Sequence, residues 1–192
     1  MKEKNLFLGN QDENAGEYVR IMISLNTPIS KKTIDNMRVG DIVSISGYIL
    51  CGRDAVLPKI VKMIEEGREK ELGIDLHGQV IFHTAVSPAG VGPTSSNKLE
   101  IENSIAPLSA AGVKIHLGKG KLHPEIMKAL DQHHAAYAVI PPVTALLGSK
   151  TSEQRVIAFP ELGMEALHLI KIDGYPAIIG AAHGRSIYDE NL

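Results

Sequence analysis

The sequence predicts an α/β fold in which a largely parallel sheet is flanked by helices. Segments rich in β-branched residues alternate along the chain with segments in which apolar residues recur at helical spacing. Several β-rich segments are short and apolar throughout, which is typical of strands buried on both faces. We therefore expect a single domain over residues 18–192, with antiparallel strands added at the ends of the sheet, and a polar N-terminal extension over residues 1–17.

The first half of the domain is expected to contain three strands and three helices. The strands are predicted over residues 18–25, 42–50 and 78–85, and the helices over residues 30–37, 55–67 and 98–111. Ser30 and Asp54 stand where helix caps are common, and Gly47 interrupts a β-rich segment as a bulge would. Residues 86–91 should form a loop that leads toward the third helix, in which Pro107 should produce a kink.

The second half continues the alternation of strands and helices. Strands are predicted over residues 113–117, 137–140, 156–159, 166–173 and 175–182, and helices over residues 124–133 and 144–154. Pro124 stands at the first helical position, which proline favours. Gly174 is expected to form the turn that joins the last two strands.

Composition narrows the class of protein. The chain has 192 residues, of which 44% are hydrophobic, and this is enough for one sizeable core. A net charge of −2, five tyrosines, three phenylalanines and no tryptophan argue against a nucleic-acid-binding surface. We expect no membrane span and no signal peptide, because the chain lacks an apolar run of about 18 residues and a charged-then-apolar leader, and we therefore expect a cytoplasmic protein.

The thiol count and the histidine spacing limit metal chemistry. The single cysteine, Cys51, excludes an intrachain disulfide, and it excludes an iron–sulfur cluster or zinc site built from this chain's thiolates alone. The eight histidines are scattered, and the adjacent pair His133 and His134 would point about 100° apart on a helix. We expect no metal site formed by this chain.

A candidate anion site lies at residues 92–98, whose sequence is GPTSSNK. Thr94, Ser95 and Ser96 bring three hydroxyls to the predicted start of a helix, where backbone N–H groups are free and the helix dipole is positive, and Lys98 adds a cation. The same residues are also compatible with an ordinary helix cap.

Two further cations follow predicted strands. Arg53 stands at the start of a helix, where a cation opposes the dipole unless an anion lies beside it. Lys119 lies between Gly118 and Gly120, an arrangement that leaves room for a ligand but is also common in turns. Since open α/β sheets place ligands at their strand ends, these cations, with Lys98 and the hydroxyls, would suit chemistry on a small C4 dicarboxylic acid.

The chain resembles a known family in the order and spacing of several short motifs, between about residues 25 and 188. These motifs are Thr27-Pro28, Val39-Gly40-Asp41, Gly52-Arg53-Asp54-Ala55, Gly92-Pro93-Thr94-Ser95-Ser96, Gly118-Lys119-Gly120, Glu161-Leu162-Gly163-Met164-Glu165 and Ala182-His183-Gly184. The family is the β subunit, or C-terminal domain, of iron–sulfur hydro-lyases that comprise class I fumarase and L(+)-tartrate dehydratase.

The resemblance implies a swivelling β/β/α-type domain that acts with a partner. The partner implied is an α subunit whose three cysteines ligate a four-iron four-sulfur cluster, in an α2β2 heterotetramer. The implied reaction is reversible hydration or dehydration of a C4 hydroxy-dicarboxylate, fumarate/L-malate first and L(+)-tartrate/oxaloacetate second. By motif, Thr94 becomes the catalytic proton-transfer residue, and the substrate-binding residues become Arg53, Ser95, Lys98 and Lys119.

Three positions depart from the family pattern. Lys98 stands where the family has arginine, which keeps the charge and loses bidentate recognition of a carboxylate. The loop over residues 85–91 is shorter than usual, and Leu57 replaces a histidine. These departures leave open a second hypothesis, in which the chain is a diverged, non-catalytic anion-binding or assembly subunit.

Overall fold

The computed structural model describes residues 22–87, 90–91, 98–141 and 144–189. Predicted site residues Thr94 and Ser95, like the predicted N-terminal extension, lie outside these ranges. Ten strands occur in the described chain: β1 (Ile23–Asn26), β2 (Ile42–Gly52), β3 (Val80–His83), β4 (Val86–Ser87), β5 (Gly90–Val91), β6 (Ile115–Gly118), β7 (Ala136–Val139), β8 (Thr151–Ala158), β9 (Leu167–Ala182) and β10 (Arg185–Ser186).

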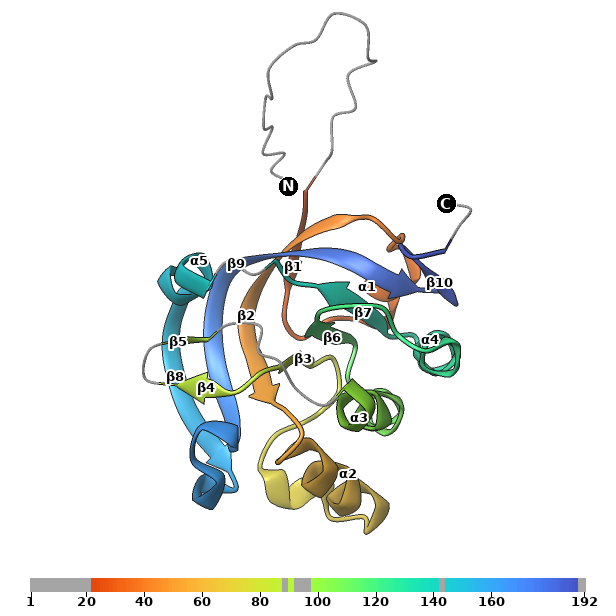
Figure 1. Ribbon diagram of the computed structural model, residues 1–192. Helices are drawn as coiled ribbons and strands as arrows, with labels where there is room; N and C mark the ends of the chain where they lie inside the picture. Colours follow the sequence, from red (N-terminus) through yellow and green to blue (C-terminus); the bar gives the residue numbers. More distant parts are fainter. Residues whose placement is uncertain (1–21, 88–89, 92–97, 142–143, 190–192) are drawn as a thin grey trace, which may run out of the picture.

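Helices connect the strands and cover the outside of the sheet (Figure 1). The α-helices of the described residues are α1 (Lys31–Asp35), α2 (Leu57–Glu65), α3 (Lys98–Ala110), α4 (Pro124–Gln132) and α5 (Thr144–Ser149). Two short 3₁₀ helices, η1 (Glu69–Leu72) and η2 (Pro160–Glu165), complete this set. Several boundaries were predictable: the Ser30 side chain caps α1 by accepting a hydrogen bond from the Thr33 N–H, and Pro124 begins α4.

The 16-residue strand β9 closes a five-stranded barrel, in the order β2-β3-β6-β7-β9 and back to β2. Within the barrel, β2, β3, β6 and β7 are parallel neighbours, and β9 is antiparallel to both β7 and β2. β1 pairs with β2 outside the ring, while β8 and β10 pair with β9. The prediction of a largely parallel sheet is therefore wrong: the domain is α/β, but its sheet is mixed and closed.

A bend within β9 explains why the sequence pattern does not predict that the sheet closes into a barrel. Gly174 does not form a turn between two strands; it lies within β9 at a φ of 68°. The pairing of β2 with β9 shifts register between Ile45 and Gly47, opposite this position, and the Gly174 N–H donates to the Ser46 hydroxyl at 2.9 Å. An irregularity of this kind increases twist and bends a strand, so one continuous strand can reach both β2 and β7.

Three other local predictions also need correction. The helix predicted over residues 144–154 ends at Ser149, and β8 begins at Thr151, whose side chain donates to the Leu147 carbonyl at 2.9 Å. Asp54 does not cap α2, because Val56 occupies the N-cap position without a side-chain bond. The loop predicted before the third helix contains a small hairpin in which β4 and β5 pair.

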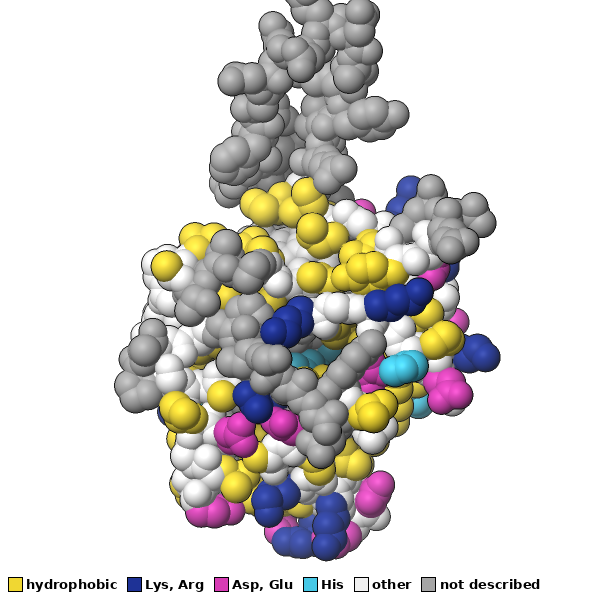
Figure 2. Space-filling model, viewed as in Figure 1, with side chains coloured by type: hydrophobic (Ala, Val, Ile, Leu, Met, Phe, Trp, Pro, Cys, Tyr) yellow, Lys and Arg dark blue, Asp and Glu magenta, His cyan; other side chains and the backbone are white. Residues whose placement is uncertain are grey.

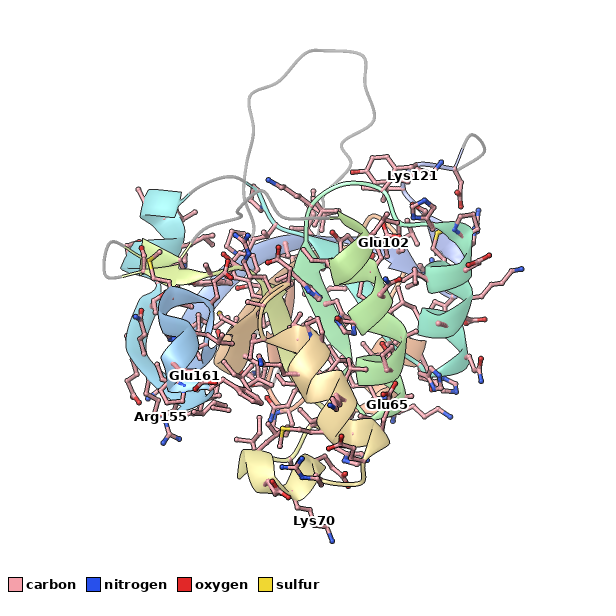
Figure 3. The ribbon with its side chains drawn as sticks, turned by 60° about the horizontal axis from the view of Figure 1, so that its bottom comes forward. Glu65, Lys70, Glu102, Lys121, Arg155 and Glu161 are labelled. Atoms are coloured by element: carbon pink, nitrogen blue, oxygen red, sulfur yellow. The ribbon has the colours of Figure 1, made fainter. Side chains whose placement is uncertain are left out.

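The core has an inner and an outer part. Buried side chains of the barrel strands fill its interior, among them Val43, Ile45, Ile49, Phe82, Ile115, Leu117 and Ile170. A second cluster packs the outer face of β2 and β3 against α2 and α3, and a third joins α3, α4 and β7. The helices α2, α3 and α4 lie side by side on the barrel (Figure 3), and α3 contacts both of the others.

Candidate functional site

The four parallel strands of the barrel all finish at the same end of the barrel, which we call the carboxyl edge, or simply the edge. At this edge Gly52 of β2 is in register with His83 of β3, and Gly118 of β6 is in register with Val139 of β7. Arg53 follows β2 directly and Lys119 follows β6 directly. Only β3 separates these strands, and neighbouring strands are ~4.8 Å apart, so the backbones of the two cations are about 10 Å apart at this edge.

Arg53 is held by two carboxylates of the protein itself. Its Nε lies 2.5 Å from Asp54 Oδ1 and 3.1 Å from Glu165 Oε1, and the Arg53 side chain is 18% exposed. The hydrogen bond with Asp54 is the main reason that the pKa of Arg53 is raised. Asp54 and Glu165 therefore supply the anion that a cation at the start of a helix requires, and they orient the guanidinium.

Lys119 is exposed, and the structure fixes its backbone more firmly than its side chain. The Tyr137 hydroxyl donates to the Lys119 carbonyl at 2.9 Å, and the Ile140 N–H donates to the Gly118 carbonyl at 3.0 Å. Within the described chain no carboxylate forms an ion pair with Lys119. Its ammonium can therefore meet an anionic ligand without first leaving a protein partner.

The loop that carries Lys119 is tied to α3. Glu102, on α3, is buried, and its carboxylate accepts hydrogen bonds from the backbone N–H of His123 at 3.4 Å and from the His123 ring Nδ1. Figure 3 shows Glu102 on the side of α3 that faces this loop. Lys98 is the first residue of α3, so the helix places its backbone at the same end of the domain.

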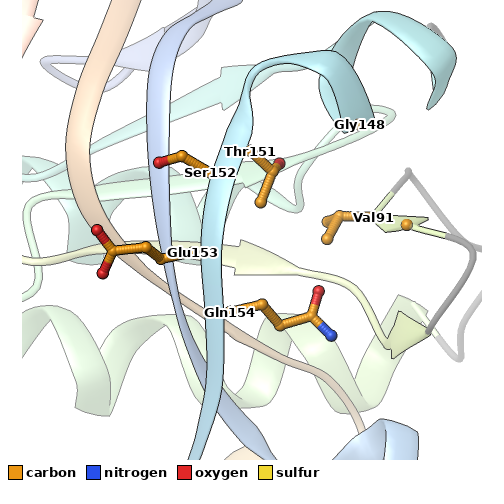
Figure 4. A pocket seen from close by; sticks show the side chains of 7 residues that line it. Val91, Gly148, Thr151, Ser152, Glu153 and Gln154 are labelled. Atoms are coloured by element: carbon orange, nitrogen blue, oxygen red, sulfur yellow. The ribbon is translucent and has the colours of Figure 1, made fainter.

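The chain that enters residues 92–97 is anchored by the β4–β5 hairpin. Val91 is buried in the barrel core, and β5 packs against α5. A pocket of about 170 Å³ lies where the hairpin, α5 and β8 meet (Figure 4) and is lined by Gly90, Val91, Gly148, Thr151, Ser152, Glu153 and Gln154. A second pocket, of about 450 Å³, lies between α2, η1 and the end of β8. Neither pocket is lined by Arg53 or Lys119.

A buried row of polar side chains lies under α3, beside the edge. His83 Nε2 is 3.1 Å from His116 Nδ1, and His116 Nε2 is 2.9 Å from the Ser109 hydroxyl. The two rings are stacked with centroids 5.3 Å apart. Burial lowers the pKa of His83 to about 3 and that of His116 well below its ordinary value, so both rings are neutral near pH 7.

The surface around the edge carries both basic and acidic side chains in the view of Figure 2. Lysine and arginine side chains stand beside the undescribed residues, and a histidine side chain is visible between them. The arrangement can bind a small dianion through charge, and a neutral histidine can add a hydrogen bond.

The side chains of the described residues do not suit a metal or cluster held by this chain. Cys51 is fully buried inside the barrel, and burial raises the pKa of its thiol, which disfavours the thiolate that a cluster requires. Across the described ranges, no three His, Cys, Asp or Glu side chains gather as metal ligands would. None of the helices in the described part of the chain is long and apolar enough to cross a membrane.

The sequence predicts Arg53 and Lys119 at strand ends, and the structure brings those ends to one edge. The sequence does not identify Glu165, His83, His116 or Ser109 as neighbours of this edge. Glu165 does belong to a motif that carries the family resemblance. His83 ends an apolar strand, and a histidine at that position was the one available signal.

Comparison with known proteins gives a consistent match. A family model described as the fumarase C-terminus matches residues 2–191. An anaerobic class I fumarate hydratase of Escherichia coli K12 is 27% identical over 182 residues, which are 90% of this chain and 33% of that protein. The chain thus spans about a third of the length of that relative.

Two shorter relatives are matched over most of their length. A protein described as a putative L(+)-tartrate dehydratase subunit beta, of Methanocaldococcus jannaschii, is 28% identical over 177 residues, 84% of this chain and 89% of that one. The L(+)-tartrate dehydratase subunit beta of Escherichia coli K12 is 26% identical over 181 residues, 87% of each chain.

Proposed function

The chain belongs to the fumarase C-terminus family, and on that premise we propose that it is the β subunit of an iron–sulfur-dependent hydro-lyase. The reaction is reversible hydration or dehydration of a C4 hydroxy-dicarboxylate, with fumarate and L-malate as the first substrate pair. The observation that supports this best is the edge of parallel strands at which Arg53 and Lys119 directly follow two separate strands, in a chain whose relatives are hydro-lyases.

The chemistry explains why these residue types are needed. Removing a proton from the carbon beside a carboxylate places developing negative charge on that carboxylate. Arg53 and Lys119 would bind the two carboxylates and offset this charge, and Lys98 and Ser95 would add a cation and a hydroxyl. The Thr94 hydroxyl would hold or accept the proton at the reacting carbon, a role that a threonine can fill only where nearby cations stabilise its charge.

The cluster would belong to the partner. We propose an α subunit whose three cysteines ligate a four-iron four-sulfur cluster, in a cytoplasmic α2β2 assembly. The names of the β-subunit relatives support the partner, and the buried state of Cys51 supports placing the cluster outside this chain. A cytoplasmic location agrees with a chain that has a single cysteine.

A second candidate substrate is L(+)-tartrate, which would be dehydrated to oxaloacetate. Its support is that an L(+)-tartrate dehydratase subunit beta and a protein described as a putative one are each matched over nearly nine-tenths of their own lengths. Lys98, Leu57 and the short loop over residues 85–91 also support a third candidate, a non-catalytic subunit that binds an anion or assists assembly.

The test is anaerobic co-expression with the candidate α subunit, followed by assays of fumarate, L-malate and L(+)-tartrate turnover. Each subunit alone is the control. Turnover that requires both chains would support the hydro-lyase and select its substrate. A stable, iron-loaded complex that is inert toward all three acids would contradict the proposed reaction. It would leave either a different hydroxy acid as substrate or the non-catalytic subunit, and measuring which acids bind would separate these two.

The proton-transfer role can be tested at Thr94. Thr94→Ala in the reconstituted complex should lower kcat by about 10²- to 10⁴-fold, because general acid–base groups contribute that much. Thr94→Ser keeps a hydroxyl and should recover a large part of the activity. Turnover by the alanine variant within a few-fold of the parent enzyme would rule out the role.

A further inference from the structure

Ser109, His116 and His83 form a row of hydrogen-bonded side chains. One ring nitrogen, at the His83 end of the row, has no hydrogen-bond partner among the described residues. This nitrogen is His83 Nδ1, and it is buried, whereas Ser109 and His116 are each bonded to the next member of the row. His83 itself is only 4% exposed. A buried ring nitrogen without a partner is uncommon in folded proteins and points to a group that binds something else.

The hydroxyl of Ser109 decides which ring nitrogens carry protons. Ser109 is 2% exposed, and its one hydrogen-bond partner within the described residues is His116 Nε2. If the hydroxyl accepted from His116, its own proton would lack an acceptor and His83 Nδ1 would also be unsatisfied. If it donates, His116 carries its proton on Nδ1 and donates to His83 Nε2, and only His83 Nδ1 stays unsatisfied. The second arrangement leaves fewer buried polar groups without partners.

In this arrangement His83 presents a neutral N–H donor. Because His83 Nε2 accepts from His116, the ring proton of the neutral histidine must lie on Nδ1. The low pKa of His83, about 3, results from burial and keeps the ring neutral at physiological pH.

The position of His83 places this donor beside the proposed site. His83 is the last residue of β3, between β2 and β6, which lead into Arg53 and Lys119. His116 is in register with Ile81, two residues earlier in β3, so it lies on the side of His83 away from the carboxyl edge. The two ring nitrogens of histidine point to opposite sides of the ring, and Nδ1 therefore faces away from His116. Gly52 is the neighbour of His83 on β2, and Gly118 stands at the same level on β6. Both are glycines, which have no side chain to fill the space beside the His83 ring.

We propose that His83 binds an oxygen of the dicarboxylate substrate through its Nδ1–H, and that Ser109 and His116 are positioning residues that fix this tautomer. The inference rests on the proposed function, since it concerns the substrate of that same site. A neutral donor adds a directed hydrogen bond between two cations without a further charge to bury. It thereby fixes the orientation of an acid whose carboxylates the cations alone would bind less selectively.

The tautomer can be measured without any activity. Long-range ¹H–¹⁵N spectra of the ¹⁵N-histidine-labelled full chain should show a protonated Nδ1 and an unprotonated Nε2 for both His83 and His116 between pH 6 and 8. Ser109→Ala removes the donor and should abolish this preference. A protonated Nε2 on His83 in the parent chain would overturn the proposal.

The binding role can be tested with a pair of isosteric variants in the reconstituted complex. In His83→Asn the amide nitrogen can occupy the position of Nδ1, whereas in His83→Gln it can occupy the position of Nε2. The KM for the substrate should rise by roughly 10- to 100-fold in His83→Gln, the loss expected for a hydrogen bond to a charged oxygen. It should stay within a few-fold in His83→Asn. The exposed His77→Gln is the control and should leave KM unchanged.

The pattern across variants separates substrate binding from a structural role. A structural role would make the asparagine variant the worse one, because it loses the bond to His116, and both variants would change Tm more than KM. Equal KM values for the two variants in an active complex would overturn the inference. A parent complex without turnover on fumarate, L-malate or L(+)-tartrate would instead overturn the proposed function, and the substrate-binding role of His83 with it. The tautomer measurement would still decide the orientation of the row.

Discussion

Buried histidines link the stability of this protein to pH. Burial lowers the pKa of His83 to about 3 and also lowers the pKa values of His116 and His168. In the unfolded chain all three titrate near pH 6.5. Below that pH the unfolded state binds more protons than the folded state, so stability falls as the pH falls from about 6.5 toward 3.

We expect His83 to remove about 2 kcal/mol of unfolding free energy between pH 8 and pH 5, and His116 to lower the unfolding free energy in the same direction. Urea unfolding at pH 8, 6 and 5 measures this change in unfolding free energy. The range lies above the pH at which most carboxylates titrate, so the histidines dominate the change. His116→Asn should be less stable overall but less sensitive to pH. An unfolding free energy that is flat between pH 8 and 5 would contradict the assignment.

Arg53 is held by two carboxylates and its side chain is 18% exposed, whereas Arg68, which also pairs with two carboxylates, is 51% exposed. Arg53→Met should raise the KM for the dicarboxylate by roughly 10- to 100-fold, because it removes a charge-assisted contact. Arg155→Met is the matched control: Arg155 is exposed on β8, as Figure 3 shows, and its loss should not change KM. An unchanged KM in the Arg53 variant would exclude the carboxylate contact.

At the scale of elements, the end of β6 couples packing to the position of Lys119. A Cβ atom at Gly118 would lie 2.5 Å from the Tyr137 hydroxyl oxygen, which donates to the Lys119 carbonyl. The tyrosine ring would have to move, and the loop that carries Lys119 would move with it.

Gly118→Ala should therefore lower the unfolding free energy by about 1–3 kcal/mol and raise the substrate KM. Gly148→Ala is the matched control, because Gly148 lies in α5 with nothing within 4 Å of the added Cβ. That change should stabilise the protein by about 0.5–1 kcal/mol and leave KM unchanged. Equal effects of the two substitutions in urea unfolding would show that the contact with Tyr137 is unimportant.

At the scale of the whole molecule, the pairing of β2 with β9 turns a sheet into a barrel. Ile49 of β2 is fully buried and in register with Ile170 of β9, so its side chain packs where the barrel closes. Ile178 lies on the same long strand but is 40% exposed.

Ile49→Ala should lower the unfolding free energy by about 2–5 kcal/mol, because it leaves a cavity in the barrel. Ile178→Ala should cost less than about 1 kcal/mol. We expect a single cooperative transition in urea, as the prediction of one domain over residues 18–192 requires. Two separate transitions would show that part of the chain unfolds independently.

How much of this was predictable depends on whether a feature is local. Ser30 capping α1, Gly47 at a bulge in β2 and Pro124 beginning α4 follow from preferences that act within a few residues, and the structure confirms them. The family resemblance, which rested on the order of short motifs, is confirmed by the family match over residues 2–191. The roles of Thr94 and Ser95 stay predictions, because these residues lie outside the described chain.

The errors and omissions share a physical cause. Gly174 permits a turn as readily as a bend within one strand, and only pairing with β2 on one side and β7 on the other makes β9 continuous. β8 is an exposed edge strand, so it lacks the apolar pattern that would distinguish it from an extension of α5.

The sequence by itself determined the family, the elements that carry Arg53 and Lys119, and the absence of cluster-forming cysteines, because motifs, local preferences and composition are properties of the chain alone. Only the tertiary structure decided that the sheet is mixed and closed, that Glu165 reaches Arg53, and that Ser109, His116 and His83 form one row. Those features depend on sheet register and on packing between distant segments, whose free energies no local pattern encodes.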